Sequence, residues 1–238
     1  MAGVDPPGSA VRREARALLV AAIAGCLASC ALDNPLGRSL GWFGYLNATD
    51  IRDTCAERTG ERYRLVYNAV WGEQVRSYDI AAGPGDSGAS LAVRVFFPEN
   101  LSAIDLGDPL ALYRGQTANV PLDRADMAAF RETLRASAFD AATPRGLVLP
   151  SDGYYWIVAA CRGGVFHYNA YAYPSAAYDG IRFDRFLFGH DPTGVAVALP
   201  GPSEPRRQRN PRGAEVGSYS VFDMTVGANG LVGVGPLF

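Results

Sequence analysis

Apolar and polar positions alternate most regularly over residues 154–173, on either side of the pair Gly163-Gly164. Adjacent glycines tolerate the positive φ angles of a tight turn, so this stretch predicts an antiparallel hairpin. A two-residue turn also fixes the register of the strands and places Trp156 opposite Tyr171.

The hairpin presents two faces, because successive side chains of a strand point in opposite directions. The more apolar face is expected to be core, and it consists of Tyr155, Ile157, Ala159, Cys161, Phe166, Tyr168, Ala170 and Ala172. The other face gathers aromatic side chains with a histidine and an asparagine, and it is the candidate binding face: Tyr154, Trp156, His167, Asn169, Tyr171 and Tyr173. Such a surface could stack on sugar rings or contact a partner protein. A second layer of the protein could instead cover it as core, and both interpretations stay open.

Shorter patterns predict further strands before and after the hairpin. They lie at residues 63–71, 74–80, 91–97 and 219–226. The first two are joined by an expected turn at Gly72-Glu73.

The clearest helix covers residues 124–137, with Asp123 as its expected N-cap. Its apolar positions recur with helical spacing and are expected to face the core: Met127, Phe130 and Leu134. A shorter helix is expected over residues 49–57, with Thr49 as N-cap. One or two helices packed on mainly antiparallel sheet give the fold class α+β.

The N-terminus carries a different kind of pattern. An apolar run over residues 17–27 is too short to span a bilayer and has the length of a signal-peptide core. It is preceded by Arg12, Arg13 and Arg16. Residues 27–30 then read Leu-Ala-Ser-Cys, which resembles the signal of bacterial lipoproteins. In that family the cysteine after two small residues is diacylated and becomes the mature N-terminus. Residues 23–26 fit the same pattern.

Cysteine parity favours Cys30 over Cys26 as the lipidated residue. With Cys30 as the anchor, Cys26 leaves with the signal peptide and the mature chain keeps an even pair, Cys55 and Cys161. A disulfide between these two is expected in an oxidising compartment. The resemblance also implies an address, since Ala31 is not the aspartate that retains such lipoproteins at the inner membrane. We therefore expect the outer membrane, facing the periplasm.

These patterns divide the chain into three parts. The expected parts are a signal peptide at residues 1–29, a lipidated tether at 30–46 and a single globular domain at 47–238, with a Pro- and Arg-rich loop near 201–217. The whole chain has 48% hydrophobic and 19% charged residues, which is enough to bury a sizeable core.

Composition excludes several kinds of chemistry. All 22 basic residues are arginines, so a P-loop lysine, a Schiff-base lysine and a Ser-Lys dyad are excluded. With only His167 and His190, a site of three histidines is excluded, and we expect neither a metal nor a cofactor. The formal net charge of −2 gives no basic field for nucleic acid, so no nucleic-acid partner is expected.

Two motifs with possible catalytic chemistry are better explained as turns. Residues 85–88 read Gly-Asp-Ser-Gly, as around the nucleophile of trypsin-like proteases, but both histidines follow this serine, whereas those proteases place theirs before it. The pair His190-Asp191 resembles the metal pair of HD phosphohydrolases, but Gly189 and Pro192 enclose it in an expected turn. We therefore expect no catalytic residues there.

Two hypotheses of function remain. The first is a non-catalytic envelope lipoprotein that contacts the membrane through its N-terminal lipid and binds an envelope protein or a glycan through the candidate binding face. The alternative is a periplasmic hydrolase that uses His167 with a carboxylate the sequence does not identify. A Cys161–His167 dyad is excluded, because the predicted register puts these two side chains on opposite faces.

Overall fold

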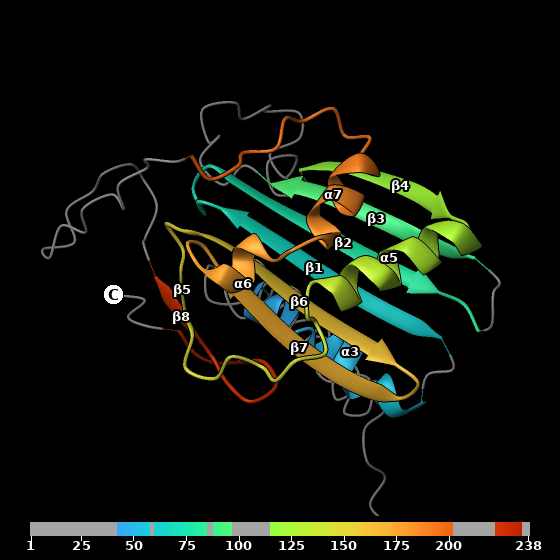
Figure 1. Cartoon of the computed structure of the whole chain (residues 1–238), viewed down its shortest axis with the longest axis horizontal. Coiled ribbons are helices and arrows are strands. Elements are labelled where there is room, and N and C mark those ends of the chain that lie inside the picture. The colour runs from blue at the N-terminus through green and yellow to red at the C-terminus, as the bar shows by residue number, and fades with distance from the viewer. Residues whose placement is uncertain (1–41, 58–59, 85–87, 97–114, 202–221, 235–238) are drawn as a thin grey trace, which may run out of the picture. The chain divides into compact units, whose positions relative to one another are not determined.

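The structure is a computed structural model of the whole chain (Figure 1). It describes residues 42–57, 60–84, 88–96, 115–201 and 222–234. The fold is α+β and mostly sheet, as the sequence predicted: a six-stranded antiparallel sheet packs against a few helices.

The large sheet has the strand order β4-β3-β2-β1-β6-β7. Its strands are β1 (Glu61–Ala69), β2 (Gln74–Ala82), β3 (Ala89–Phe96), β4 (Gln116–Leu122), β6 (Tyr154–Arg162) and β7 (Val165–Ala172). A small sheet has the order β5-β8-β9 and consists of β5 (Val148–Pro150), β8 (Asp223–Val226) and β9 (Leu231–Val234).

The helices lie on both faces of the large sheet (Figure 1). They are α3 (Thr49–Asp53), the 3-10 turn η1 (Cys55–Glu57), α5 (Arg124–Ala136), α6 (Ala176–Asp179) and α7 (Phe183–Gly189). Figure 1 shows α5, α6 and α7 in front of the sheet and α3 behind it. We call the side under α5 and α7 the front face.

Helix α5 has the N-cap and the buried face that its sequence predicts. Asp123 is the N-cap, and its side chain accepts a hydrogen bond from the Asp126 backbone N–H at 2.8 Å. The Asp126 carboxylate in turn accepts from the Asp123 N–H at 3.0 Å, which completes a reciprocal cap. The three positions predicted to face the core are all buried: Met127, Phe130 and Leu134.

The predicted hairpin is confirmed in its turn and in its register. Gly163 and Gly164 both have positive φ angles, 56° and 77°, and Trp156 lies opposite Tyr171. The more apolar face of the hairpin lies on the rear of the sheet. Tyr155 and Tyr168 of this face are buried, as expected for core residues.

The helix predicted over residues 49–57 is shorter than expected and is not capped by Thr49. Ala48 occupies the N-cap position with φ 49° and makes no side-chain cap. The helix stops at Asp53, and η1 continues the segment as a separate turn. Ile51 is the one buried residue of α3. A longer helix over residues 49–57 would gain little from packing, and packing supplies most of the stability of a short helix.

The chain divides into two units between Tyr45 and Leu46. The second contains all the helices and strands named above. In the first, described residues 42–45 are helical, and the rings of Trp42 and Tyr45 stack with centroids 5.5 Å apart.

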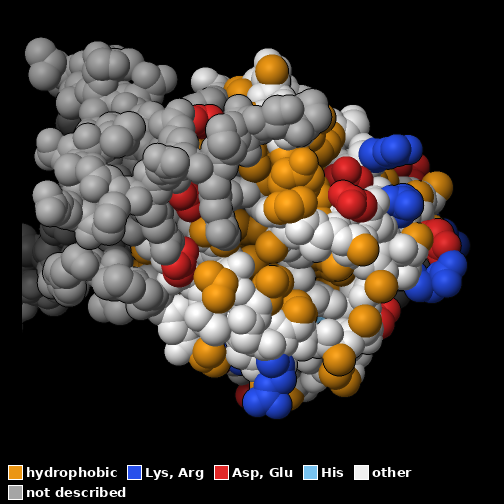
Figure 2. All heavy atoms as spheres, turned by 60° about the vertical axis from the view of Figure 1, so that its left-hand side comes forward, with side chains coloured by type: hydrophobic (Ala, Val, Ile, Leu, Met, Phe, Trp, Pro, Cys, Tyr) orange, Lys and Arg blue, Asp and Glu red, His pale blue; other side chains and the backbone are white. Residues whose placement is uncertain are grey.

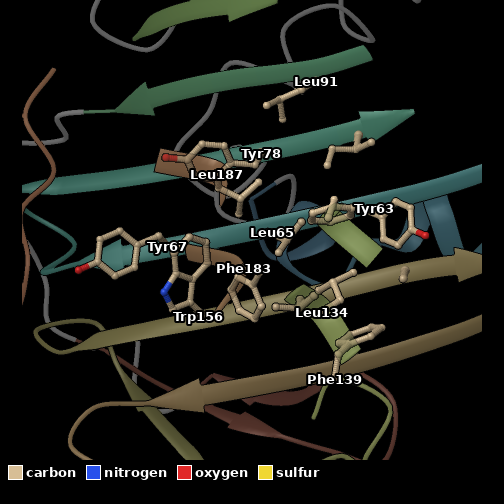
Figure 3. Close-up of a cluster of buried hydrophobic side chains, with 14 of the residues drawn as sticks. Tyr63, Leu65, Tyr67, Tyr78, Leu91, Leu134, Phe139, Trp156, Phe183 and Leu187 are labelled. Carbon is tan, nitrogen blue, oxygen red and sulfur yellow. The ribbon is translucent and has the colours of Figure 1, made fainter. Parts of the chain in front are cut away.

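The main core lies between the front face of the large sheet and helices α5 and α7. Figure 3 shows the strand side chains of this face meeting those of the helices. Tyr63 of β1 packs edge-on against Phe130 of α5, with centroids 5.0 Å apart. Phe183 of α7 packs edge-on against Trp156 at 5.2 Å. The elements are held in place mainly by aromatic contacts.

Candidate functional site

The centre of the candidate binding face is buried, which favours the second of the two interpretations there: another layer of the protein covers it as core. Trp156 is 1% exposed, and Tyr171 and Asn169 are buried with it. The cover is α7 together with the segment that follows α5, because Phe183 contacts the rings of both Trp156 and Tyr171. The apolar sides of α5 and α7 need a partner, and this face supplies it (Figure 3).

The two polar residues of the same face bind backbone rather than a ligand. Asn169 Nδ2 donates to the Phe139 carbonyl at 3.0 Å, and His167 Nε2 lies 2.8 Å from the same oxygen. The His167 imidazole also packs edge-on against the Phe139 ring. Both side chains thus fix the turn after α5 to the sheet.

The hydrolase alternative gains no support from this arrangement. In the described part of the chain, none of the ion pairs involves His167. Because a carbonyl oxygen can only accept, Nε2 is the nitrogen that donates to Phe139, and no carboxylate of the described residues holds the ring in place. General-base catalysis needs an imidazole oriented by a carboxylate or similar group toward a reacting atom.

The outer end of the candidate binding face stays partly open. Tyr154 and Tyr173 are half-buried, and Tyr178 of α6 joins them. The Tyr173 ring meets the Tyr154 ring at 6.4 Å and the Tyr178 ring at 5.3 Å, both edge-on. We call these three residues the tyrosine rim. Figure 2 shows hydrophobic side chains gathered on this side of the molecule.

One residue of the rim, Tyr178, is hydrogen-bonded to the buried Tyr67. Tyr67, beneath it on β1, donates to the Ala198 carbonyl at 2.7 Å. Burial raises the pKa of Tyr178 to about 12, with the hydrogen bond to Tyr67 acting in the opposite direction. The Tyr178 hydroxyl is therefore neutral at physiological pH.

A buried ionic network that the sequence did not reveal lies on the same front face, on β2. Arg76 is 0% exposed and forms an ion pair with Asp191, which follows α7. Asp191 also accepts from the Tyr78 hydroxyl at 3.1 Å and from the Thr193 N–H at 3.0 Å. Hydrogen bonds from the protein thus reach both oxygens of this carboxylate.

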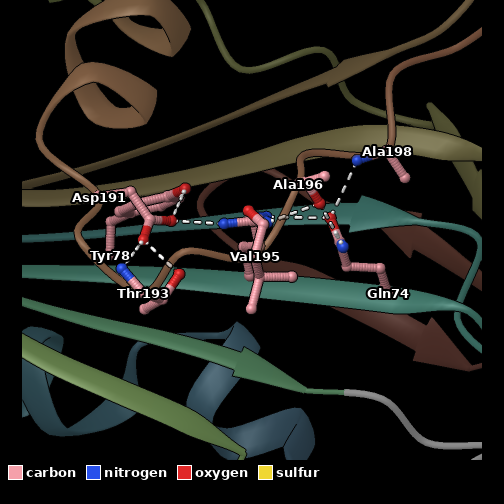
Figure 4. Close-up of polar contacts among 8 residues, drawn as sticks. Gln74, Tyr78, Asp191, Thr193, Val195, Ala196 and Ala198 are labelled. Atoms are coloured by element: carbon pink, nitrogen blue, oxygen red, sulfur yellow. Dashed lines mark hydrogen bonds and ion pairs between the residues drawn. The ribbon is translucent and has the colours of Figure 1, made fainter.

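The same arginine fastens the strap, as we call residues 191–198, across the sheet (Figure 4). Arg76 Nη2 donates to the carbonyls of Val195 and Ala196 at 2.7 and 2.9 Å. Gln74 receives the Ala198 N–H at 3.1 Å and donates to the Ala196 carbonyl at 2.9 Å. Alternation along β2 could have predicted that Gln74 and Arg76 are buried, because they occupy the same face of the strand as Tyr78. Buried polar side chains need hydrogen-bond partners, which the strap supplies.

The predicted disulfide is present and buried. Cys55 of η1 and Cys161 of β6 are bonded across a sequence separation of 106 residues, with Cα atoms 5.6 Å apart. The bond fastens η1 to a central strand on the rear face of the sheet, which also removes Cys161 from any pairing with His167.

A separate chain of charges ties α3 to the rear face of the sheet. Arg64 of β1 contacts Asp50 through two hydrogen bonds of 2.7 and 3.1 Å, and its Nε donates to Asp79 at 2.7 Å. Burial raises the pKa of Asp50, but the hydrogen bonds and charge of Arg64 outweigh it and hold that pKa below its ordinary value.

Several sequence predictions concern residues outside the described ranges. They are Cys26 and Cys30, most of the tether, the Asp86-Ser87 motif, and the arginines Arg206, Arg207, Arg209 and Arg212 of the predicted loop. Within the described ranges, no helix is long and apolar enough to cross a membrane. Nor do three or more His, Cys, Asp or Glu side chains gather there as they would to hold a metal ion.

The chain was compared with known proteins at the level of sequence and of structure. Neither family models, nor curated proteins, nor solved structures gave a match to this chain.

Proposed function

We propose that this protein is an exported, lipid-anchored module of the bacterial cell envelope that binds rather than catalyses. The observation that carries the proposal is the Cys55–Cys161 disulfide. Structural disulfides persist in oxidising compartments such as the periplasm and are rare in the cytosol. A buried disulfide downstream of a signal-like apolar run is therefore what an exported domain needs.

The anchor follows from the same pair of cysteines. Because Cys55 and Cys161 bind each other, the cysteines left over lie only at the N-terminus, where the pattern resembles a lipoprotein signal. Acyl chains on Cys30 would contribute about 0.8 kcal/mol per buried methylene, and two or more chains suffice for stable attachment. The proposed address is the outer membrane, facing the periplasm.

A binding role fits the described residues better than a hydrolytic one. Asp191 is engaged in structural hydrogen bonds, and His167 binds a backbone carbonyl and not a carboxylate in the described part of the chain. Two residues of the tyrosine rim, Tyr154 and Tyr173, belong to the part of the candidate binding face that solvent reaches. Rings that carry hydroxyl groups can stack on a pyranose and hydrogen-bond to it, so we favour a glycan over a protein partner.

Metabolic labelling with a palmitate analogue tests the anchor in cells. Wild type should incorporate label and Cys30→Ser should not, while Cys26→Ser should be labelled like wild type. Equal labelling of wild type and Cys30→Ser would contradict lipidation at Cys30. Absence of label from all three, together with free Cys55 and Cys161 thiols, would contradict the exported location itself.

A further inference from the structure

The two edges of the large sheet are built differently. At the β7 edge, Thr143 Oγ1 donates to the Tyr168 carbonyl at 2.6 Å, and Asn169 holds the Phe139 carbonyl. This edge is therefore flanked by the segment that follows α5. At the opposite edge lies β4, and among the described residues nothing is hydrogen-bonded to its outer side (Figure 1). The open edge of the sheet is β4.

The proline of β4 fixes which backbone groups point outward. Pro121 is paired within the β3–β4 ladder but has no N–H, so the even-numbered residues of β4 carry the hydrogen bonds to β3. The bond from Gly83 N–H to the Gly88 carbonyl sets the same alternation along β3 from its other side. Thr117 and Asn119 therefore direct both their N–H and C=O groups away from the sheet.

The side chains of β4 offer little protection of this edge. Its sequence contains no charged residue, although charges are the usual means by which edge strands avoid pairing. Thr117, Asn119 and Pro121 are exposed. Pro121 removes one outward donor near the end of the strand and leaves the donors of Thr117 and Asn119 in place.

We propose that β4 pairs antiparallel with β4 of a second copy of this chain, about a two-fold axis at Ala118. In this register Thr117 of one copy lies opposite Asn119 of the other, and the two exchange N–H···O=C bonds on each side of the axis. The small side chains of Ala118 meet at the axis. Pro121 lies opposite Gly115, which has no side chain to obstruct the proline ring.

The neighbouring symmetric register fits less well. If the axis passed through Asn119, Pro121 would lie opposite Thr117. The proline ring would then stand where the Thr117 carbonyl needs a donor, on both sides of the axis. The register about Ala118 moves this loss to the carbonyl of Gly115, which lies outside β4, and keeps all the outward bonds of Thr117 and Asn119. It forms a continuous antiparallel sheet across the two copies.

Cysteine cross-linking tests the register in the full chain, exported with its own N-terminus. At Ala118 the two copies form a non-hydrogen-bonded pair, whose Cα atoms are about 4.5 Å apart and within reach of a disulfide. On a non-reducing gel, Ala118→Cys should give a disulfide-linked dimer severalfold above wild type, which carries the same N-terminal cysteines. The matched control is Ala128→Cys, exposed on α5.

The proposal is overturned if Ala118→Cys cross-links no more than Ala128→Cys, or if it cross-links chiefly to a different protein. A second variant isolates the backbone bond. Asn119→Pro removes an outward N–H and no ladder bond to β3, just as Pro121 does in the native chain. In the Ala118→Cys background it should abolish the cross-link and leave Tm unchanged; a persistent cross-link contradicts the pairing. Should Asn119→Pro not fold, Asn119→Lys adds an edge charge with the same expected loss.

Discussion

Arg76 and Asp191, 115 residues apart in the chain, form an ion pair that is shut off from solvent, with side chains 0% and 3% exposed. Burial removes both charges from water, which costs several kcal/mol per ion, and the attraction between the two ions offsets this cost. Tyr78 and Thr193 also donate to the Asp191 carboxylate. The Arg76 guanidinium also donates to Gln74 and to the carbonyls of Val195 and Ala196, so hydrogen bonds support both ions. Loss of one partner should therefore cost more than loss of an exposed pair.

We expect Asp191→Asn to lower the free energy of unfolding by about 3–5 kcal/mol, because it leaves the Arg76 charge buried without a counter-ion. Urea denaturation measures this directly. Glu132→Gln is the control, since the exposed Glu132–Arg135 pair of α5 should contribute no more than about 0.5 kcal/mol. Equal losses in the two variants would mean that solvent reaches the Arg76 site. The double variant Arg76→Leu/Asp191→Leu should lose less than the sum of the single ones.

The disulfide should contribute a large part of the total stability. Closing a loop of about 100 residues restricts the unfolded chain by about 4–5 kcal/mol in the chain-entropy model. Paired Cys55→Ser/Cys161→Ser should lose up to this amount against oxidised wild type in denaturant titrations. Reduced wild type should then match the double variant. A double variant as stable as the oxidised protein would mean that α3 and η1 are held by packing alone.

Trp156→Ala should act as a core substitution and not as a loss of binding surface. Deleting this buried ring is expected to cost about 3–5 kcal/mol of folding free energy. Val165→Ala, at the exposed hairpin tip on the same sheet face, should stay within about 0.5 kcal/mol of wild type. A Trp156→Ala protein with wild-type stability would restore the interpretation of this face as a surface.

The hairpin and α5 could be predicted because local signals decide them. Gly163-Gly164 sets the register, and Asp123 caps a helix whose apolar spacing is regular. The burial of Trp156 could not be predicted, because it depends on α7, a short helix without a capping side chain at Arg182. Alternation along β2 places Arg76 at a core position, but no local pattern identifies its partner Asp191, which lies 115 residues away.

β4 and β9 were missed for a related reason. β4 has alternating exposed positions but few β-forming side chains, and it becomes a strand by pairing with β3. β9 is a four-residue strand in a glycine-rich end, held in part by Asn47, whose side chain accepts the Leu231 N–H at 2.6 Å. Both owe their structure to a distant partner.

The tyrosine rim predicts binding to a glycan of the envelope. Wild-type protein should sediment with purified insoluble peptidoglycan, and Tyr173→Ala should reduce the bound fraction severalfold, because it removes the ring that contacts both neighbours. Tyr173→Phe keeps the ring and should retain most of the binding. Unchanged Tm in both variants would separate binding from folding. If wild type does not sediment while Cys30 is labelled, the glycan is excluded and the lipid anchor stands.

The Asp50–Arg64 contact predicts a stability difference that depends on pH. Because the pKa of Asp50 in the folded protein lies below its unfolded value of about 3.9, the contact stabilises the fold above that value. The contribution is lost as the pH falls through the folded pKa, when the carboxylate takes up a proton. Asp50 is more than half exposed, so Asp50→Asn should cost no more than about 1 kcal/mol at pH 6. Urea titrations of wild type and Asp50→Asn should therefore differ at pH 6 and converge as the pH falls below about 4. In an Arg64→Met background the difference should vanish at both pH values, and a difference that persists there would assign it to another partner of Asp50.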